Sequence, residues 1–311
     1  MYKLTDRKND IIIPKIHPAA SNDKFERFDI LGKGSYGTVY KASYKETNEL
    51  VAIKKLNKAY IKLNNLEAYV KREYINLSKM NHPFVISLYH HFETDTDTFL
   101  VLEYCPLGEL QSLVSPTRID EHSVKFYVAE ILLALEYMHS MNVMHRDLKP
   151  ANILIDGDGH IRIADFGLSK EVCKMVDQKA TLVGAPHYIA PEYLNRKKIT
   201  QGADLYSLGI IMFELINGYA PYDANNRVKL FRKIKNGKLV IPKGTSVEAT
   251  KLLRRLLHVK TEKRPSVEEV KRDPFFSGID WDKLLAKEYE PPLKEFSRAK
   301  DRESLSNILT D

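Results

Sequence analysis

The spacing of the apolar residues changes near residue 104 of this 311-residue chain. Before that point, short runs of β-branched and aromatic residues lie between turn residues, which is typical of strands, and one helix is expected over residues 66–80. After it, apolar residues recur every three to four positions, which predicts helices. Residues 202–218 are apolar on nearly every face, so we expect a buried central helix there. Strands followed by helices predict an α+β fold of two lobes, one small and β-rich, the other larger and mainly α-helical.

The other expected elements follow from the same patterns. Strands are expected over residues 28–31, 38–42, 50–54, 85–92 and 99–104, and helices over about 124–138, 225–236, 246–257 and 266–271.

Composition excludes several classes of protein. Apolar residues make up 43% of the chain and charged residues 29%, as in globular rather than disordered proteins. Two cysteines, Cys105 and Cys173, cannot form a disulfide framework, which favours a reducing compartment. No apolar run approaches the ~18 residues of a membrane helix, and we recognise no signal peptide. We therefore expect a cytoplasmic monomer without a membrane span, and the nucleus is compatible with the same features.

The net charge of +7 favours anionic ligands. The basic residues form only short, scattered clusters, and no repeat of basic and aromatic residues accompanies them. We therefore expect no nucleic-acid partner.

A glycine-rich segment follows the first expected strand. It reads Gly32-Lys33-Gly34-Ser35-Tyr36-Gly37-Thr38-Val39. Glycines let backbone amides approach phosphate oxygens closely, although a plain hairpin turn explains this segment equally well by itself. The next segment is a strand rather than a helix, and no Gly-Lys-Ser/Thr follows, so neither a dinucleotide-binding unit nor a P-loop is indicated. The remaining functional interpretation is a β-hairpin that covers the phosphates of a nucleotide.

Three further elements suit phosphoryl transfer. Lys54 lies on an apolar strand, and Glu73, on the helix that follows, is a candidate ion-pair partner. Asp147 and Asp165 flank a short apolar hairpin over residues 153–163, so both carboxylates can return to one site. One can accept a hydroxyl proton while the other, with Asn152, holds Mg²⁺ against phosphates.

In this order, these motifs resemble those of the eukaryotic protein kinases over about residues 28–276. The resemblance implies ATP and Mg²⁺ as cofactors and protein substrates. It makes Asp147 the catalytic base and Asn152 and Asp165 the metal ligands. Lys149 would steady the transferred phosphate, as in serine/threonine kinases, and Lys54 would pair with Glu73. The resemblance assigns the ATP site to Leu31, Gly32, Lys33, Gly34, Ser35, Tyr36, Gly37, Thr38, Val39, Ala52, Lys54, Leu102, Glu103, Cys105, Glu109 and Leu154.

The same resemblance sets the expected domain boundaries and two supporting contacts. Residues 1–27 form a leader, 28–104 the small lobe, 105–276 the large lobe and 277–311 a tail. Glu192 should form a buried pair with Arg264, and Asp204 should brace the catalytic loop.

Residues 273–281 resemble the end of the kinase domain in the AGC group, the cyclic-nucleotide-dependent kinases and their relatives. The tail lacks the hydrophobic motif of most members. Residues 58–73 are most similar to the phosphoinositide-dependent protein kinases, which lack that motif too and dock substrates, other AGC kinases, in the empty pocket. Lys58, Ile61 and Val70 would line this pocket. A kinase closer to the cyclic-nucleotide-dependent type, or a pseudokinase that binds nucleotide as a scaffold, is the alternative.

The resemblance also predicts regulation by phosphorylation. Thr181 lies where the group carries its phosphorylated residue, and Arg146, Lys170 and Arg72 would gather the phosphate. Ala185 replaces a threonine that bonds the catalytic base in serine/threonine kinases, which is the best argument for reduced activity.

Overall fold

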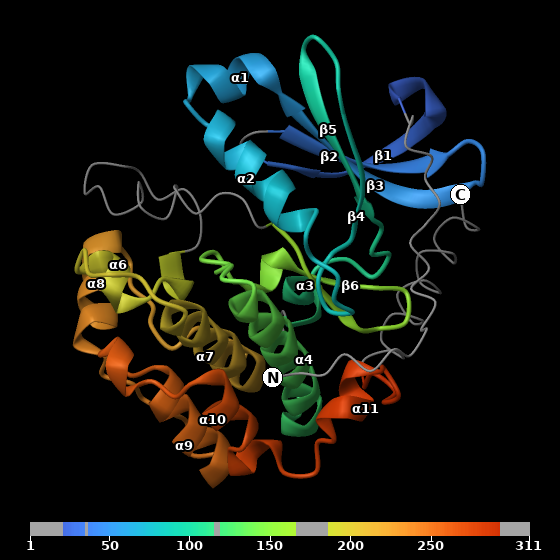
Figure 1. The fold of residues 1–311 in the computed structure, drawn as a ribbon. Coiled ribbons are helices and arrows are strands. Elements are labelled where there is room, and N and C mark those ends of the chain that lie inside the picture. The colour runs from blue at the N-terminus through green and yellow to red at the C-terminus, as the bar shows by residue number, and fades with distance from the viewer. Residues whose placement is uncertain (1–20, 35–36, 115–118, 166–185, 293–311) are drawn as a thin grey trace, which may run out of the picture. The chain divides into compact units, whose positions relative to one another are not determined.

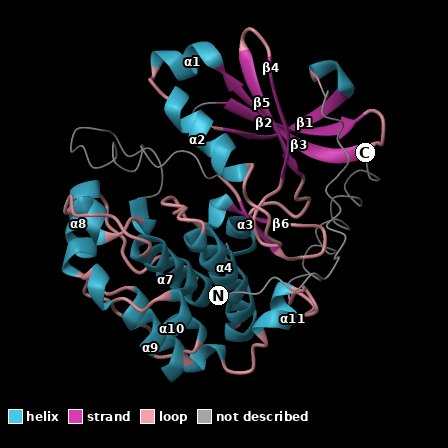
Figure 2. Ribbon diagram, in the orientation of Figure 1, coloured by secondary structure: helices cyan, strands magenta, loops and turns pink. Residues whose placement is uncertain are grey.

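The computed structural model describes residues 21–34, 37–114, 119–165 and 186–292 (Figure 1). Contacts within the chain divide it into two compact units. Unit 1 comprises residues 1–67 and 87–104, and unit 2 comprises residues 68–86 and 105–311. Segment 68–86, expected in the small lobe, therefore groups with unit 2 in this division. In the described residues, strands dominate unit 1 and helices dominate unit 2, so the α+β fold class is confirmed (Figure 2).

Unit 1 is built on a five-stranded antiparallel sheet with strand order β1-β2-β3-β5-β4. The strands are β1 (Phe25–Lys33), β2 (Gly37–Tyr44), β3 (Glu49–Asn57), β4 (Leu88–Glu93) and β5 (Asp97–Glu103). A short 3-10 helix, η1 (Asn22–Lys24), precedes the sheet, and helix α1 (Lys58–Leu63) follows β3. The side chain of Asn57 caps α1 by accepting a hydrogen bond from the backbone N–H of Tyr60 at 2.8 Å.

The two faces of this sheet differ because side chains alternate along each strand. One face carries the apolar core of unit 1, in which Ile53 is fully buried between its neighbours. The members of this core are Phe25, Ala42, Tyr44, Val51, Ile53, Phe99 and Val101. Lys54, adjacent to Ile53, therefore belongs to the opposite face.

Unit 2 contains most of the helices. They are α2 (Glu67–Leu77), which begins on the last residue of unit 1, α3 (Leu110–Val114), α4 (Glu121–Ser140), α6 (Pro191–Leu194), α7 (Gly202–Asn217), α8 (Arg227–Asn236), α9 (Val247–Leu256), α10 (Val267–Lys271) and α11 (Trp281–Leu285). Short 3-10 helices are η2 (Pro150–Asn152), η3 (Pro186–Tyr188), η4 (Thr261–Lys263) and η5 (Pro274–Phe276), and strands β6 (Ile153–Ile155) and β7 (Ile161–Ile163) form a small hairpin. In the described residues, no helix is long and apolar enough to cross a membrane.

Helix α7 forms the core of unit 2, as its apolar sequence predicted. It packs against α4 and α9, and nearly all of its side chains are buried (Figure 1). The close approach of α9 requires glycine at position 209, because a Cβ atom there would lie 2.8 Å from the Cβ atom of Leu256. Burial on all faces explains why this segment shows no polar stripe.

One buried ion pair fastens the segment before α7. The guanidinium of Arg264 donates two hydrogen bonds of 2.7 Å to the carboxylate of Glu192, and a third to the carbonyl of Gly202. Both side chains of the pair are almost fully buried. Two parallel bonds satisfy both carboxylate oxygens, which offsets the cost of removing the two charges from water. The predicted Glu192–Arg264 pair is confirmed.

Two expectations about the strands are wrong in detail. The first strand begins at Phe25 rather than at residue 28, because the Phe25 ring packs on Tyr44 and on Phe92. Residues 85–87 do not extend β4. Ile86 instead donates its backbone N–H to the carbonyl of Ile163, and Ile163 donates to the carbonyl of Phe84, so residues 84–86 pair with the hairpin of unit 2.

Candidate active site

The Asp204 carboxylate organises the loop that carries the predicted catalytic residues. It lies in the first turn of α7 and accepts hydrogen bonds from the backbone N–H groups of His145, at 3.0 Å, and Arg146, at 2.8 Å. The Nε2 atom of His139, at the end of α4, lies 2.8 Å from the same carboxylate. The bracing role predicted for Asp204 is confirmed. Arg146 has a left-handed backbone conformation with φ of 69°, which these bonds to Asp204 hold in place.

The environment keeps Asp204 ionised although it is fully buried. Burial alone would raise the pKa of this carboxyl group. The hydrogen bond from His139 and the charges of His139 and His145 oppose burial, and the N–H of Arg146 adds to them, so the pKa of Asp204 is lowered overall. The charged form of the carboxyl group beneath the loop is therefore favoured.

Asp147 is held in place by two neighbours on its own loop. The ammonium group of Lys149 lies 2.8 Å from the Asp147 carboxylate. The amide nitrogen of Asn152 donates to the Asp147 carbonyl at 2.8 Å and to its carboxylate at 3.0 Å. The Asp147 side chain remains 35% exposed, so one side of the carboxylate is accessible to an incoming hydroxyl group. These contacts bring together the predicted base, the predicted phosphate-binding lysine and one predicted metal ligand.

Asp165 is tied to the same loop through the backbone next to it. The N–H of Ala164 donates to the carbonyl of Asn152 at 2.9 Å, and the carbonyl of Ala164 lies 2.9 Å from Nε2 of His145. The β6–β7 hairpin connects the two segments and reverses the chain between them. Asp147 and Asp165 therefore reach one region of unit 2 despite their separation in sequence.

Glu109 lies within electrostatic range of this region. It forms a β-bridge with Leu154 on β6. Partial burial and the charge of Asp165 raise the pKa of Glu109, while Lys149 acts in the opposite direction. A carboxyl group whose ionisation is disfavoured by a nearby carboxylate marks a site that favours a cation.

The donor set fits Mg²⁺ bound mainly through its substrate. In the described residues, no group of three His, Cys, Asp or Glu side chains could hold a metal ion. The amide nitrogen of Asn152 is engaged by Asp147, so its oxygen is the atom directed to a cation. Mg²⁺ takes few protein ligands and completes its octahedron with phosphate oxygens and water, so Asn152 and Asp165 suffice as protein ligands.

The sheet of unit 1 contributes the other predicted site residues. Residues directly opposite in an antiparallel pair share a face. Val39 is opposite Lys54, and Ala52 is opposite Leu102. Ala52 and Lys54 are two positions apart on β3, so all four side chains lie on the face of the sheet opposite the core of unit 1.

The glycine-rich segment forms the end of the β1–β2 hairpin. Gly32 pairs with Val39, Lys33 pairs with Thr38, and the N–H of Gly34 donates to the carbonyl of Gly37 at 2.9 Å. A Cβ atom at Gly37 would lie 2.0 Å from the Lys55 carbonyl, so the protein itself requires glycine there. Among the described residues, nothing lies within 4 Å of a Cβ atom at Gly32, and only the Gly37 carbonyl lies near one at Gly34, so their packing does not require glycine at these two positions.

The remaining predicted residues are distributed as follows. Leu31 is exposed on β1, and the N–H of Glu103 donates to the carbonyl of Ser87 at 3.0 Å. Cys105 is buried, and the buried Glu73 lies on α2. Lys54 belongs to unit 1 and Glu73 to α2 in unit 2, and their pairing stays a prediction. Ser35, Tyr36, Lys170, Thr181 and Ala185 lie outside the described residues, as does the side chain of Arg72.

Sequence reasoning missed His139 and a second buried pair. Nδ1 of His160, just before β7, lies 2.5 Å from the carboxylate of Glu130 on α4, which also accepts the N–H of Ile161. This pair anchors the hairpin that leads to Asp165. One signal in the sequence could have revealed these contacts. Glu130 and His139 lie within the mostly apolar buried stripe of α4, and a buried polar side chain needs a partner.

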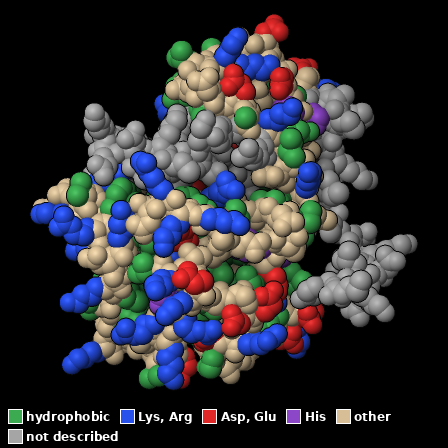
Figure 3. Space-filling model, turned by 60° about the vertical axis from the view of Figure 1, so that its left-hand side comes forward, with side chains coloured by type: hydrophobic (Ala, Val, Ile, Leu, Met, Phe, Trp, Pro, Cys, Tyr) green, Lys and Arg blue, Asp and Glu red, His purple; other side chains and the backbone are tan. Residues whose placement is uncertain are grey.

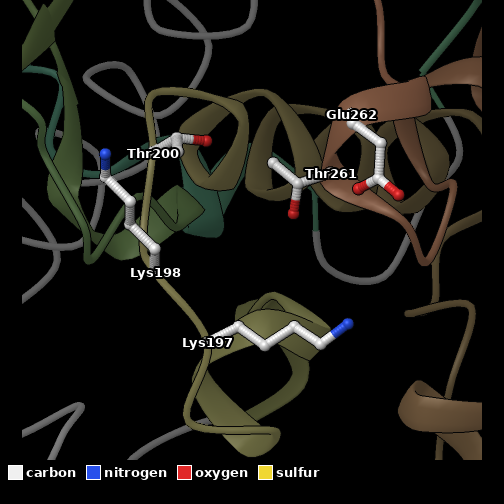
Figure 4. A pocket seen from close by; sticks show the side chains of 5 residues that line it. All are labelled: Lys197, Lys198, Thr200, Thr261 and Glu262. Carbon is white, nitrogen blue, oxygen red and sulfur yellow. The ribbon is translucent and has the colours of Figure 1, made fainter.

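An open pocket lies elsewhere in unit 2, between the loop that precedes α7 and η4. Its volume is about 530 Å³. Lys197, Lys198 and Thr200 line one side, and Thr261 and Glu262 line the other (Figure 4). None of these residues was predicted to bind ATP or metal.

Comparison with known proteins agrees with this geometry. The chain matches the protein kinase domain over residues 25–276. It is 39% identical over 287 residues to ribosomal protein S6 kinase alpha-3 of Homo sapiens, covering 89% of this chain and 39% of that protein. It is 40% identical over 284 residues to ribosomal protein S6 kinase alpha-2 of Mus musculus, covering 88% and 39%. It is 38% identical over 291 residues to putative ribosomal protein S6 kinase alpha-1 of Caenorhabditis elegans, covering 91% and 37%. The chain thus spans about two fifths of the length of these relatives.

Substituting the glycines one at a time should separate packing from ligand binding. Gly37→Ala should lower the free energy of unfolding by about 1–3 kcal/mol, because strand β3 must move away from the added methyl group. Gly34→Ala should leave stability within about 0.5 kcal/mol, because the nearest atom of the described residues that a Cβ would meet is 3.7 Å away. It should raise the KM for ATP, because the added methyl group keeps the backbone from approaching phosphate oxygens closely. Urea denaturation and ATP titration measure the two effects. An unchanged KM for Gly34→Ala would contradict a role for this glycine in phosphate binding.

Proposed function

The chain belongs to the protein kinase family, and we propose that it transfers the γ-phosphate of ATP to serine and threonine hydroxyl groups of proteins. The relatives named as ribosomal protein S6 kinases support a serine/threonine kinase of the AGC group. The arrangement of Asp147 with Lys149 and Asn152 over the buried Asp204 carboxylate carries the proposal.

Each of these residues has a separate task in the reaction. Asp147 orients the protein hydroxyl and accepts its proton as the oxygen attacks the γ-phosphorus, and the bond from that phosphorus to the bridging oxygen of ADP breaks. Lys149, 2.8 Å from Asp147, neutralises charge on the transferred phosphoryl group. Mg²⁺, held by Asn152 and Asp165 when bound, neutralises the phosphates of ATP. Asp204 does not react, but it holds Arg146, next to the base, in its left-handed backbone conformation.

The alternative is a pseudokinase that binds nucleotide without transferring phosphate. A degenerate kinase usually lacks the lysine, the base or a metal ligand, whereas Lys54, Asp147, Asn152 and Asp165 are all present here. The residue set therefore favours an enzyme.

Replacing the base tests the assignment directly. Asp147→Asn should lower kcat about 10²–10⁴-fold with little change in ATP affinity, because the base contacts the protein hydroxyl rather than the nucleotide. Radiolabelled phosphate transfer to a peptide library measures the rate, and nucleotide titration measures the affinity. Asp158→Asn is the matched control, because Asp158 is an exposed carboxylate in the β6–β7 turn and should retain full activity. Equal activity of Asp147→Asn and wild type would refute the mechanism and favour the scaffold.

The likeness to the phosphoinositide-dependent kinases supports a finer proposal, that the substrates are activation loops of other AGC kinases docked through a hydrophobic tail. Lys58 and Ile61 lie on α1, and Val70 lies on α2. The ammonium group of Lys58 is held at 2.7 Å from both the Glu93 carboxylate and the Thr94 carbonyl, and Ile61 is buried. A fixed cation beside apolar groups suits a peptide that carries aromatic and acidic residues. A kinase closer to the cyclic-nucleotide-dependent type would not need this pocket.

Docking predicts a difference between two substrates. Lys58→Ala should slow phosphorylation of a protein substrate that ends in a hydrophobic tail, whereas a short peptide without the tail should be unaffected. Lys62→Ala, an exposed lysine of the same helix, is the control and should change neither rate. Equal losses on both substrates with Lys58→Ala would count against docking.

Phosphorylation of Thr181 is our proposal for regulation. Arg146 supports it, because its Nε atom is buried and has no hydrogen-bond partner among the residues that the structure describes. A buried guanidinium nitrogen favours an anion nearby. A phosphate would supply about −1.5 to −2 charges and three acceptor oxygens, and Lys170 and Arg72 are the other proposed partners.

Intact-mass analysis of protein expressed in bacteria tests this regulation. Wild type should carry one phosphate on Thr181, and the inactive Asp147→Asn variant should lack it because the kinase modifies itself. Thr181→Ala should lose most of its activity because Arg146 is left without its anion. A fully active wild type without phosphate would exclude the mechanism.

A further inference from the structure

The excess positive charge of the chain is concentrated in two segments. Residues 195–202 and 219–247 together contain ten lysines and arginines and one acidic residue, Asp223. All other residues of the chain contain 38 lysines and arginines against 40 acidic residues. The two segments therefore have a net charge of +9, and the rest of the chain has a net charge of −2, which together give the total of +7. This distribution corrects the interpretation that the basic residues are scattered.

The fold brings the two segments together on one side of unit 2. Helix α8 lies in the second segment and packs against α6, which directly precedes the first. Leu230 and Ile234 form the buried side of α8. Its other side exposes Lys229, Arg232, Lys233 and Lys235, whereas Arg227 is half-buried. Figure 3 shows Lys and Arg side chains spread over the left-hand part of unit 2, with most acidic side chains farther to the right. We call the cations of both segments the basic surface. They are Arg196, Lys197, Lys198, Arg227, Lys229, Arg232, Lys233, Lys235, Lys238 and Lys243.

Internal carboxylates do not neutralise this surface. Arg227 lies over the ring of Phe231. Within the part of the chain that the structure describes, the other nine cations form no ion pair with an acidic side chain. By contrast, Arg255, Lys271 and Lys287 elsewhere in unit 2 each contact a carboxylate within 3 Å. Ten like charges repel one another, and an anionic partner relieves that repulsion.

Exposed aliphatic side chains accompany the cations. Val228 on α8 is 65% exposed and Val240 is 71% exposed, and Tyr219 and Val247 are exposed as well. The pocket of Figure 4 adds two hydroxyl groups, Thr200 and Thr261, beside Lys197 and Lys198. Single-stranded nucleic acid would call for several aromatic side chains on which bases stack, but Tyr219 is the sole large aromatic among these exposed residues. Lysines mixed with exposed aliphatic groups are the combination that binds anionic lipid.

We propose that the basic surface binds the anionic lipid headgroups of a membrane and holds the kinase there by electrostatic attraction. Cations near an anionic bilayer each strengthen binding about fivefold, so several exposed residues of the basic surface acting together give appreciable affinity. Val228 and Val240 add contacts with the interfacial region of the bilayer. The proposal does not depend on the phosphoryl-transfer chemistry, because none of these residues belongs to the candidate active site.

Vesicle co-sedimentation of the full chain tests the proposal. Wild type should bind vesicles of phosphatidylcholine and phosphatidylserine, should not bind phosphatidylcholine alone, and should dissociate as salt is raised. The triple variant Lys229→Glu, Arg232→Glu, Lys235→Glu should bind phosphatidylserine vesicles at least ~10-fold more weakly. The double variant Lys197→Glu, Lys198→Glu should weaken binding in the same direction. All five residues are exposed, so the fold and the phosphorylation of a soluble peptide should be retained.

A matched variant separates a local surface from the overall charge. Lys79→Glu, Lys251→Glu, Arg254→Glu changes the net charge by the same amount at exposed positions outside the basic surface. It should bind vesicles like wild type. Equal losses in the two triple variants, or binding to neutral vesicles as strong as to anionic ones, would overturn the proposal. Stronger binding of wild type to a duplex RNA or to polyglutamate than to anionic vesicles would overturn it in favour of a nucleic-acid or acidic-protein partner.

Discussion

The catalytic loop depends on the buried carboxylate of Asp204. This group accepts the backbone N–H groups of His145 and Arg146 and is bonded to His139. Its charge is stable because hydrogen bonds and neighbouring histidines outweigh the cost of burial. These bonds allow Arg146 to adopt a left-handed backbone conformation that it would otherwise avoid. The next residue is Asp147, so the position of the proposed base follows from a carboxylate that does not react.

Buried polar pairs repeat this arrangement around the core of unit 2. Glu192 and Arg264 satisfy each other and the carbonyl of Gly202 beside α7, while Glu130 fastens His160 and the start of β7. Each pair joins segments far apart in the sequence. A buried charge is costly without its partner, so the pairs favour one arrangement of the loops over others. The apolar side chains of α7 make up much of the core of unit 2, and the buried polar pairs fix the positions of the loops that pack against this core.

The candidate active site and the basic surface differ in how their charged side chains are paired. The Asp147 carboxylate has defined partners at close range, Lys149 and Asn152, and the pKa of Glu109 responds to Asp165. Defined partners suit a reaction in which charges must lie within a few tenths of an ångström of their places. On the basic surface, all the cations except Arg227 are exposed and form no ion pair with an acidic side chain of the described residues, which suits attraction to an extended anionic partner without a unique geometry. Unit 2 can therefore combine an active site of defined geometry with a surface proposed to bind a membrane by electrostatic attraction.

The sequence by itself determined the fold class and most helices and strands, and it supplied the candidates for the reacting groups. Periodicity and motif spacing are local properties, so Gly202–Asn217 and the loop around Asp147 were recognisable from their neighbours alone. Only the tertiary structure decided that residues 84–86 pair with β7, that His139 reaches Asp204, and that glycine is required at position 37 by the carbonyl of Lys55. It also gathered two basic segments that look scattered along the chain. Each of these depends on which distant segments the packed core brings within contact distance, and no local pattern encodes that distance.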